Sequence, residues 1–168
     1  MKSLRDTFLE PLAPLVLDFR LMERSDSDLL RKWKNMNRHS FFHREVISPS
    51  EQRSWFIAYE VDPFNAMFIW TPDEGDCGSI GLRRVANAIE VYNVMSWCEV
   101  TKGTGKFLSS VRNLLQLISE HFPDISIQTS VLNQNPAVQW YQKLGFDELE
   151  LVTHESGQDF ILMKFARK

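Results

Sequence analysis

Several features that would define a protein class are scarce in this chain of 168 residues. Its two cysteines, Cys77 and Cys98, are too few for a disulfide framework or a structural zinc site. Seven glycines and seven prolines exclude collagen-like and low-complexity disordered proteins. No apolar run approaches the roughly 20 residues that span a bilayer. The first ten residues mix charged and apolar side chains and lack the apolar stretch of a signal peptide.

An excess of charge of one sign is also missing. Nineteen Lys and Arg residues stand against 22 Asp and Glu residues, which gives a net charge of −3 and an isoelectric point near 5.8. This balance provides no broad electrostatic surface for nucleic acid or an anionic membrane, so neither is expected as a partner. We expect a cytoplasmic protein in a reducing compartment, either a monomer or a homodimer. The length suits one domain, with an N-terminal arm at residues 1–14 and a single domain at residues 15–168.

What the chain does contain is an alternation of short apolar strands and amphipathic helices. Helices are expected after the capping residues 25–28, after Ser48, from Lys106, and over residues 136–144. The third of these carries a continuous apolar stripe from Phe107 to Phe122. Strands are expected at residues 15–22, 66–70, 77–85, 88–97, 125–131, 146–153 and 159–165. This order predicts an α/β (α+β) domain with a mixed sheet rather than a regular doubly wound one.

A glycine-rich turn, Gly103-Thr104-Gly105, lies between the strand at 88–97 and the long helix. Glycines let backbone N–H groups point at a ligand, and a helix N-terminus adds a positive dipole, so such a turn can hold a phosphate or pyrophosphate. The spacing is not that of a Walker A loop, because Val100 stands where that loop has its first glycine, nor that of a dinucleotide fingerprint. Alone, the turn is equally consistent with a tight strand-to-helix connection.

A second segment, VLNQNPAVQWYQKLGF at residues 131–146, resembles the closing signature of the GNAT superfamily of acetyl-CoA-dependent N-acetyltransferases. In that signature an Asn and an Ala are followed by a Tyr four residues later and then by Gly-Phe. Ala137, Tyr141, Gly145 and Phe146 fit this spacing, and the glycine turn lies about thirty residues upstream, as in the family. Three further segments resemble the branch that holds ribosomal-protein N-acetyltransferases and amino-sugar N-acetyltransferases: Trp33-Lys34-Asn35, residues 47–56 and residues 78–83.

The resemblance implies a fold and a reaction. The fold would be the GNAT fold, a mixed and mostly antiparallel central sheet of about seven strands flanked by about four helices. The reaction would move an acetyl group from acetyl-CoA, a co-substrate, to a primary amine by direct attack in a ternary complex, with no metal. The expected acceptor is a small molecule, an amino sugar or a nucleotide-linked amino sugar. Two alternatives stay open: a protein or peptide N-terminus, and a degenerate domain that binds acyl-CoA without turnover.

The resemblance also implies roles for individual residues. Tyr141 is the candidate general acid for the leaving thiolate, and Glu90 is the candidate base, acting directly or through water. Each has a structural alternative, a buried tyrosine with a satisfied hydroxyl and an exposed strand carboxylate. The residues expected to contact the cofactor are Val94, Met95, Ser96, Lys102, Gly103, Thr104, Gly105, Lys106, Asn133 and Asn135.

Two positions depart from the family pattern. Val100 stands where the family usually has Arg or Gln, and Gln134 stands where it has Asn. Lys102 and Lys106 are candidates to compensate for the first, although a one-residue deletion before the loop is equally consistent. The neighbouring Asn133 and Asn135 are the candidates for the second.

A cluster of basic and aromatic residues lies between the first two expected helices, where GNAT proteins build much of the acceptor site. Arginines there could bind the phosphates of a sugar nucleotide, and aromatic rings could pack against a sugar. The alternative is a solvated loop that a phenylalanine anchors. The candidate acceptor-binding residues are Arg38, His39, Phe42, His43 and Arg44.

Overall fold

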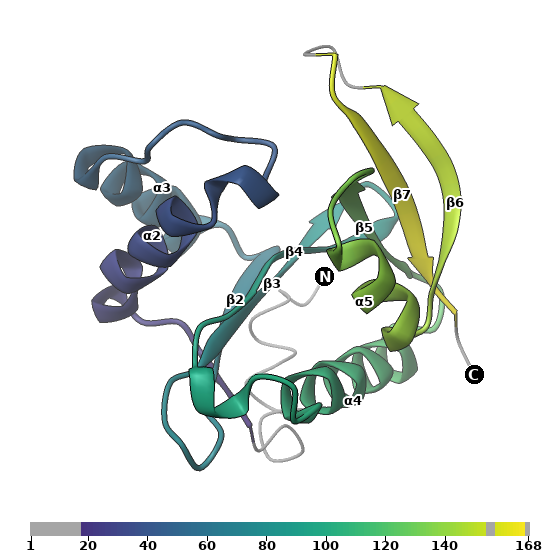
Figure 1. The fold of residues 1–168 in the computed structure, drawn as a ribbon, viewed down its shortest axis with the longest axis horizontal. Coiled ribbons are helices and arrows are strands. Elements are labelled where there is room, and N and C mark those ends of the chain that lie inside the picture. The colour runs from purple at the N-terminus through teal and green to yellow at the C-terminus, as the bar shows by residue number, and fades with distance from the viewer. Residues whose placement is uncertain (1–17, 154–156, 167–168) are drawn as a thin grey trace.

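The computed structural model describes residues 18–153 and 157–166, so the expected N-terminal arm at residues 1–14 lies outside the described residues. The strands of the described part form one seven-stranded sheet in the order β1-β2-β3-β4-β5-β7-β6 (Figure 1). All neighbouring strands are antiparallel except β4 and β5, which run parallel. The strands are β1 (Phe19–Leu21), β2 (Asn65–Trp70), β3 (Gly78–Val85), β4 (Ala88–Ser96), β5 (Ser126–Leu132), β6 (Phe146–Thr153) and β7 (Asp159–Phe165).

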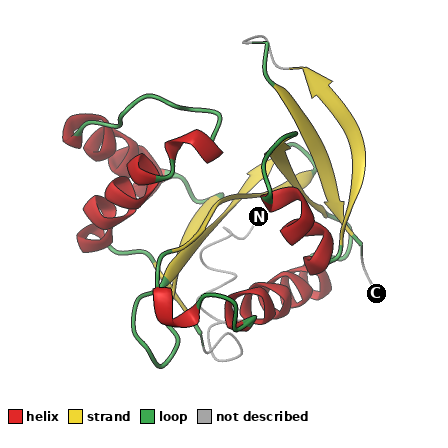
Figure 2. Ribbon diagram, viewed as in Figure 1, coloured by secondary structure: helices red, strands yellow, loops and turns green. Residues whose placement is uncertain are grey.

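Four α-helices of the described residues flank this sheet, two on each side (Figures 1 and 2). None of the described helices is long and apolar enough to cross a membrane. The α-helices are α2 (Ser27–Met36), α3 (Pro49–Val61), α4 (Lys106–His121) and α5 (Ala137–Leu144). Three short 3-10 helices are η2 (Arg24–Asp26), η3 (Arg38–Ser40) and η4 (Glu99–Thr101).

The predicted fold class and order of elements are confirmed. The first strand is shorter than the predicted residues 15–22, and residues 15–17 lie outside the described part. Local signals placed the helix ends correctly. Ser48 and Glu51 form the capping box that begins α3, and Gly145, at φ +108°, ends α5 in the left-handed region that glycine favours.

Strand β4 contains a bulge at its centre. Ser79 pairs with Met95 and Gly81 pairs with Tyr92, so Asn93 and Val94 together lie opposite the single residue between them on β3. Asn93 takes φ +48°, and the Ser79 hydroxyl donates to its carbonyl oxygen at 3.0 Å. An extra residue increases the local twist and changes which side chains face each side of the sheet.

The bulge divides β4 between two hydrophobic cores. Before it, Ile89 and Val91 pack in the core beneath α4 and α5. After it, Met95, again at an odd position, packs in the other core, beneath α2 and α3. The single inserted residue therefore lets β4 contribute side chains to both cores, while its last residues turn away from β5 and stay paired with β3.

The parallel pair β4–β5 ends early. Its register runs only from Ala88 opposite Ser126 to Glu90 opposite Gln128, although both strands continue. Beyond this point the two strands separate, and the edge of β4 that faces β5 is no longer used for sheet pairing. Val94, Met95 and Ser96, which the resemblance implied as cofactor contacts, lie in the part of β4 beyond this last pair.

A partly buried ion pair joins the first strand to the start of α2. Arg20 donates to both carboxylate oxygens of Asp26, at 2.7 and 2.8 Å, and also to Asp76 at 2.7 Å. Burial opposes the charged form of Asp26, but hydrogen bonds from Arg20 and from the Glu23 amide outweigh it, so the pKa of Asp26 is lowered. Asp26 therefore stabilises the fold as a carboxylate.

We predict that Asp26→Asn lowers the free energy of unfolding at pH 7 by about 1.5–3 kcal/mol, because it removes the charge that these donors face. The difference in the free energy of unfolding between wild type and Asp26→Asn should shrink as the pH falls below the ordinary carboxyl pKa of 3.8. A carboxyl group whose pKa is lowered in the fold stabilises the protein only while it is ionised. Chemical denaturation of both proteins at pH 7 and at a pH below 3.8 measures this difference. Asp28→Asn is the control: Asp28 is exposed in the first turn of α2, and its loss should have a much smaller effect.

Candidate active site

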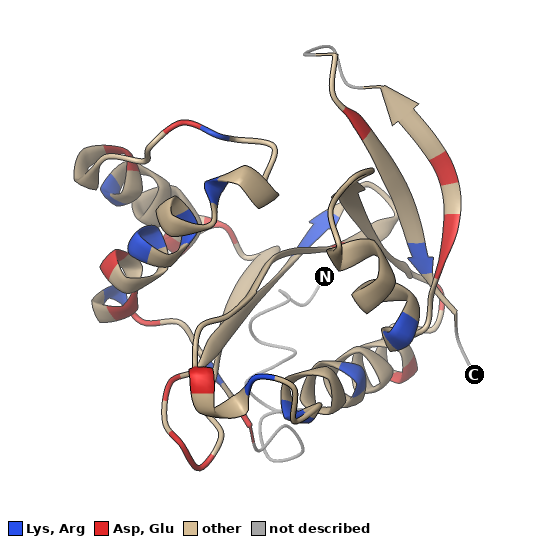
Figure 3. Ribbon diagram, viewed as in Figure 1, with Lys and Arg blue, Asp and Glu red and all other residues tan. Residues whose placement is uncertain are grey.

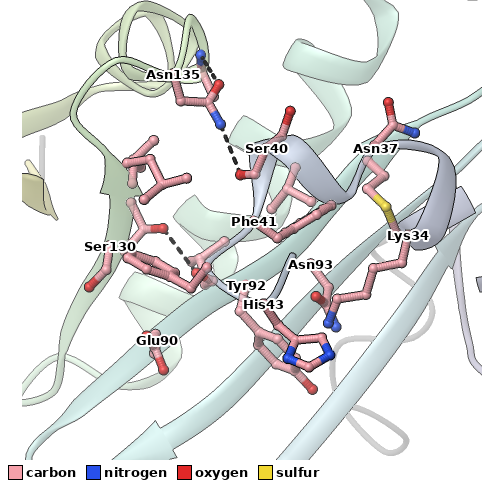
Figure 4. Close-up of a pocket in the computed structure, with 18 of the residues that line it drawn as sticks. Lys34, Asn37, Ser40, Phe41, His43, Glu90, Tyr92, Asn93, Ser130 and Asn135 are labelled. Carbon is pink, nitrogen blue, oxygen red and sulfur yellow. Dashed lines mark hydrogen bonds between the residues drawn. The ribbon is translucent and has the colours of Figure 1, made fainter. Parts of the chain in front are cut away.

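A cavity of about 460 Å³ lies where β4 and β5 separate (Figure 4). Its walls come from α2, the α2–α3 segment, consecutive residues of β4, the facing end of β5, and α5. The structure thus brings together eight of the predicted site residues: Phe42, His43, Glu90, Val94, Met95, Ser96, Asn135 and Tyr141.

Glu90 lies at the apex of the separation. It is the last residue of β4 that pairs with β5, and its side chain lines the cavity. Arg83, its cross-strand neighbour on β3, donates from Nε to the Glu90 carboxylate at 2.6 Å. The Arg83 guanidinium also lies over the Tyr92 ring, 4.9 Å from its centroid. Arg83 therefore fixes the direction in which the Glu90 carboxylate faces, and the Tyr92 ring supports Arg83 in turn.

Tyr141 reaches the same cavity from α5. The residue is only 6% exposed, and its ring packs edge-on against Phe146 at 5.3 Å. Burial, together with the nearby charge of Glu90, raises the pKa of Tyr141 to about 12, although the Thr129 hydroxyl acts in the opposite direction. The phenol therefore keeps its proton at neutral pH.

Tyr92, which sequence reasoning missed, forms another wall. Its hydroxyl donates to Asn65 Oδ1 at 2.5 Å, and burial raises its pKa. The ring lies so close to Gly81 that a Cβ atom there would stand 2.5 Å from it. The sequence signal for this packing is Gly81 itself, a glycine inside a strand, which leaves room for the Tyr92 ring and stands beside the bulge.

Residues 37–47, which we call the strap, extend from α2 to α3 along one side of the cavity. Asn35 closes the base of the strap, accepting from the Ile47 amide at 2.8 Å and donating to its carbonyl at 2.9 Å. At its middle, Asn135 donates to the Ser40 carbonyl at 3.0 Å (Figure 4). Phe42 packs edge-on against Phe160 of β7 at 5.4 Å. The strap therefore joins the α2–α3 side of the molecule to the β5–α5 side.

Nine predicted residues do not line the cavity: the five of the turn at residues 102–106, described below, and four others. The side chains of Arg38, His39 and Arg44 are exposed on the strap, and Asn133 is exposed after β5. Asn135 does line it, yet its side chain is already engaged: Oδ1 accepts from the Ala137 amide at 2.9 Å, while Nδ2 donates to the strap. Of the two asparagines, only Asn135 is thus placed at the cavity.

The glycine turn lies at the end of the segment into which β4 leads, outside the cavity lining. Gly103 and Gly105 take φ +73° and +75°, and a Cβ at either would meet no atom within 4 Å. Within the described part of the chain, the amides of Phe107 and Leu108 in the first turn of α4 have no protein acceptor. The turn therefore presents open space and unused N–H groups at a helix N-terminus.

The two lysines of this turn are paired with carboxylates. Lys102 forms an ion pair with Glu99, and Lys106 forms one with Glu74 from the acidic turn between β2 and β3, which lies beside the start of α4 (Figure 3). If these lysines replace the Arg or Gln that the family has at the position of Val100, the phosphates of a ligand must compete with Glu99 and Glu74 for them.

A smaller cavity of about 240 Å³ adjoins the first on the side of α2 and α3. The two share four lining residues, and the smaller one is completed by α3 and the end of the strap. Sequence analysis noted Lys34 and Trp55 only as parts of segments that resemble the family, and it did not single out Asn93. The shared residues are Lys34, His43, Trp55 and Asn93.

In the described residues, no group of three or more His, Cys, Asp or Glu side chains is arranged to hold a metal ion.

Solved structures share this architecture. The Vibrio cholerae spermidine N-acetyltransferase in complex with CoA and spermine is similar with a TM-score of 0.71 at 21% identity, over 88% of this chain and 93% of that one. The aminoglycoside acetyltransferase AAC(6')-Ib in complex with ribostamycin and coenzyme A is similar with a TM-score of 0.70 at 19% identity, over 89% and 93%. No protein-family model and no curated protein sequence matches the chain. The predicted GNAT fold is confirmed, and at these identities the likeness establishes the fold alone.

We predict that Asn135→Ala exposes the strap, because it removes the bond to Ser40 and the bond that begins α5, together worth about 1–2 kcal/mol. Trypsin should then cleave after Arg38 or Arg44 faster than in wild type, by about fivefold or more. Timed digestion with mass spectrometry measures both sites. Asn133→Ala removes a neighbouring exposed side chain and should leave the rates unchanged. Equal rates in wild type and Asn135→Ala would mean that this bond does not hold the strap.

Proposed function

We propose that the protein is an N-acetyltransferase that moves the acetyl group of acetyl-CoA to a primary amine of a small molecule, an amino sugar or a nucleotide-linked amino sugar. The observation that carries the proposal is the early end of the β4–β5 pairing, with a carboxylate and a buried phenol lining the cavity that results. The fold adds support, because the similar structures named above are a spermidine N-acetyltransferase and an aminoglycoside acetyltransferase, each in complex with CoA.

Two features fit acetyl-CoA. The edge of β4 beyond Glu90 has backbone groups that no strand of the described part uses on the β5 side, and these suit the amides of a pantetheine arm. The turn at Gly103–Gly105 and the unused amides of α4 suit a pyrophosphate. When bound, acetyl-CoA supplies the thioester. Val94, Met95 and Ser96, with the turn, are the residues that we propose to hold it.

The chemistry then divides among the residues of the cavity. The acceptor amine attacks the thioester carbonyl and forms the C–N bond, and Glu90 takes a proton from the amine, directly or through a water. Backbone N–H groups of β4 stabilise the negative charge that develops on the carbonyl oxygen. The C–S bond breaks, and Tyr141 gives its proton to the departing sulfur. The raised pKa of Tyr141 keeps that proton available across the physiological range.

The acceptor half of the site favours a small, polar ring. Aromatic side chains and amides line the cavity together, an arrangement that suits a hydroxylated ring with one apolar face. The volume of about 460 Å³ is that of a small-molecule site, and the strap closes one side of it. These features support a small molecule over a polypeptide N-terminus. The residues concerned are Asn37, Phe41, Trp55, Tyr92 and Asn93.

Tyr141→Phe tests the proposed acid. The ring is retained, so fold and acetyl-CoA affinity should be nearly unchanged, while kcat and kcat/KM should fall together by about 10²-fold, the usual size of a general-acid contribution. Thioester consumption with a panel of amines measures the rates. Tyr59→Phe is the control, because the Tyr59 hydroxyl accepts from the Met67 amide and the residue does not line the cavity.

A Tyr141→Phe enzyme with wild-type kcat, when chemistry limits the rate, would reduce Tyr141 to a packing residue. Binding of acetyl-CoA without thioester consumption for any amine would instead support the binding-domain alternative.

Gly105→Val tests the cofactor turn. The protein leaves open space at this position, so the added side chain should obstruct the phosphate and weaken acetyl-CoA binding by about tenfold or more, roughly 1.4 kcal/mol. Gly157→Val is a matched control, since Gly157 has φ +77°, equally open surroundings and no place in the site. Both variants should lose about 1–2 kcal/mol of stability to backbone strain. Calorimetry that finds equal acetyl-CoA affinity in the two folded variants would remove the turn from the cofactor site.

A further inference from the structure

Lys34 is the charged residue of the cavity to which the proposed reaction gives no role. It extends from α2 towards Asn93 and His43 and lines both cavities at the place where they join (Figure 4). Its side chain is half-buried, and its ammonium group lies 5.5 Å from the centre of the Phe41 ring. The stem is therefore packed, while the charged end remains at the cavity.

The carboxylates that line the two cavities are already occupied. Glu90 is paired with Arg83, and Glu51 accepts hydrogen bonds from the Ser48 amide and hydroxyl, each at 2.7 Å. No carboxylate of the described residues forms an ion pair with Lys34. Burial lowers the pKa of Lys34, and the charge of Arg83 lowers it further, so the surroundings of this ammonium disfavour its charge. Within the described residues the Phe41 ring contacts this ammonium but no carboxylate pairs with it, so it is placed to pair with the negative charge of a ligand.

We propose that the acceptor amine carries an acidic group, a carboxylate or a phosphate ester, and that Lys34 binds this group at the junction of the two cavities. This inference rests on the proposed transferase function, which it narrows from amino sugars in general to acidic ones. Because Lys34 and Glu90 face the same cavity from different elements, the acidic group and the reacting amine of one small molecule can be bound at the same time.

The same residues disfavour a polycation. A ligand such as the spermine or ribostamycin of the similar structures would bring further positive charges beside Lys34 and Arg83. With Glu90 and Glu51 engaged, such a ligand would find little negative charge to compensate. Repulsion between the positive charges of the ligand and those of the site therefore disfavours a polycation, just as attraction favours an acidic ligand.

Arg38 and Arg44, the arginines first considered for phosphate binding, lie on the exposed face of the strap. The residue that selects an acidic acceptor is therefore Lys34 and not the more conspicuous basic cluster. This difference gives the inference a separate test.

The experiment compares matched sugars: glucosamine, glucosamine 6-phosphate, glucosamine 1-phosphate and muramic acid, with spermidine as the polycation. Rates with acetyl-CoA and calorimetric affinities in the presence of CoA are both measured. We expect at least one acidic sugar to bind and react about 10-fold or more better than glucosamine. Comparison of the two phosphates with muramic acid shows whether the preferred acidic group is a phosphate ester or a carboxylate. Lys34→Met should remove that preference, because a charged hydrogen bond to the acidic group is lost. The KM for the preferred acidic sugar should rise about 10- to 100-fold, while the KM for glucosamine should stay the same.

Lys34→Arg should restore the preference in part, because it keeps the charge, and Lys34→Glu should shift it towards spermidine. Lys32→Met is the matched control, on the same helix, exposed, paired with Asp28 and outside both cavities. A double Arg38→Ala and Arg44→Ala variant should keep the wild-type preference. Lys34→Met should leave acetyl-CoA affinity unchanged, a readout that a general loss of folding would not give.

The outcomes separate the two proposals. Efficient turnover of glucosamine or spermidine, with no preference for acidic sugars and no effect of Lys34→Met, overturns the inference and leaves the transferase function standing. Binding of an acidic sugar that depends on Lys34, without turnover of any amine, supports the inference as a binding site and overturns the transferase function. Failure of the wild-type protein to bind any of the acidic sugars at millimolar concentration overturns the inference.

Discussion

The site depends on one constraint of the sheet: β4 must pair with β3 along its whole length while it leaves β5 after Glu90. The bulge at Asn93 makes both possible, because an inserted residue twists the strand without ending its antiparallel ladder. A regular strand would either stay with β5, which closes the cavity, or lose its pairing with β3. The catalytic candidates, the cofactor edge and the acceptor wall all take their places from this local irregularity.

The bulge also explains why two cores meet at the cavity. Helices α4 and α5 cover one face of the sheet and α2 and α3 cover the other, and β4 contributes buried residues to both. The opening between β4 and β5 is thus the place where side chains from opposite layers face the same space. Tyr141 arrives from the α5 layer and Lys34 from the α2 layer. Two side chains that line one cavity therefore come from helices on opposite faces of the sheet.

Much of the fold could be predicted from the sequence because its elements are short and locally marked. The stripe that ends at Phe122, the capping box at Ser48 and the glycine after Leu144 each depend on neighbours within a few residues. The resemblance placed Glu90 and Tyr141, which do reach one cavity. The bulge at Asn93 could not be predicted, since it is a mismatch of register between two strands. The position of Lys34 depends on how α2 packs, which no local pattern specifies.

The strap was predicted from its composition to bind the acceptor, and that prediction divides in the structure. Phe42 and His43 line the cavity, whereas Arg38, His39 and Arg44 are exposed outside its lining. Composition reports which chemistry is available, whereas the direction of each side chain is decided by contacts with residues about a hundred positions away, such as Asn135 and Phe160.

The bonds that hold the strap have a consequence for how its sequence can change over time. At its base and its middle, the strap contributes main-chain atoms, the amide and carbonyl of Ile47 and the carbonyl of Ser40, to asparagines outside it. Main-chain atoms are the same for every amino acid, so substitution at His39, His43 or Arg44 leaves these bonds intact. The strap can therefore accumulate substitutions beside the cavity while its attachment to the rest of the fold persists.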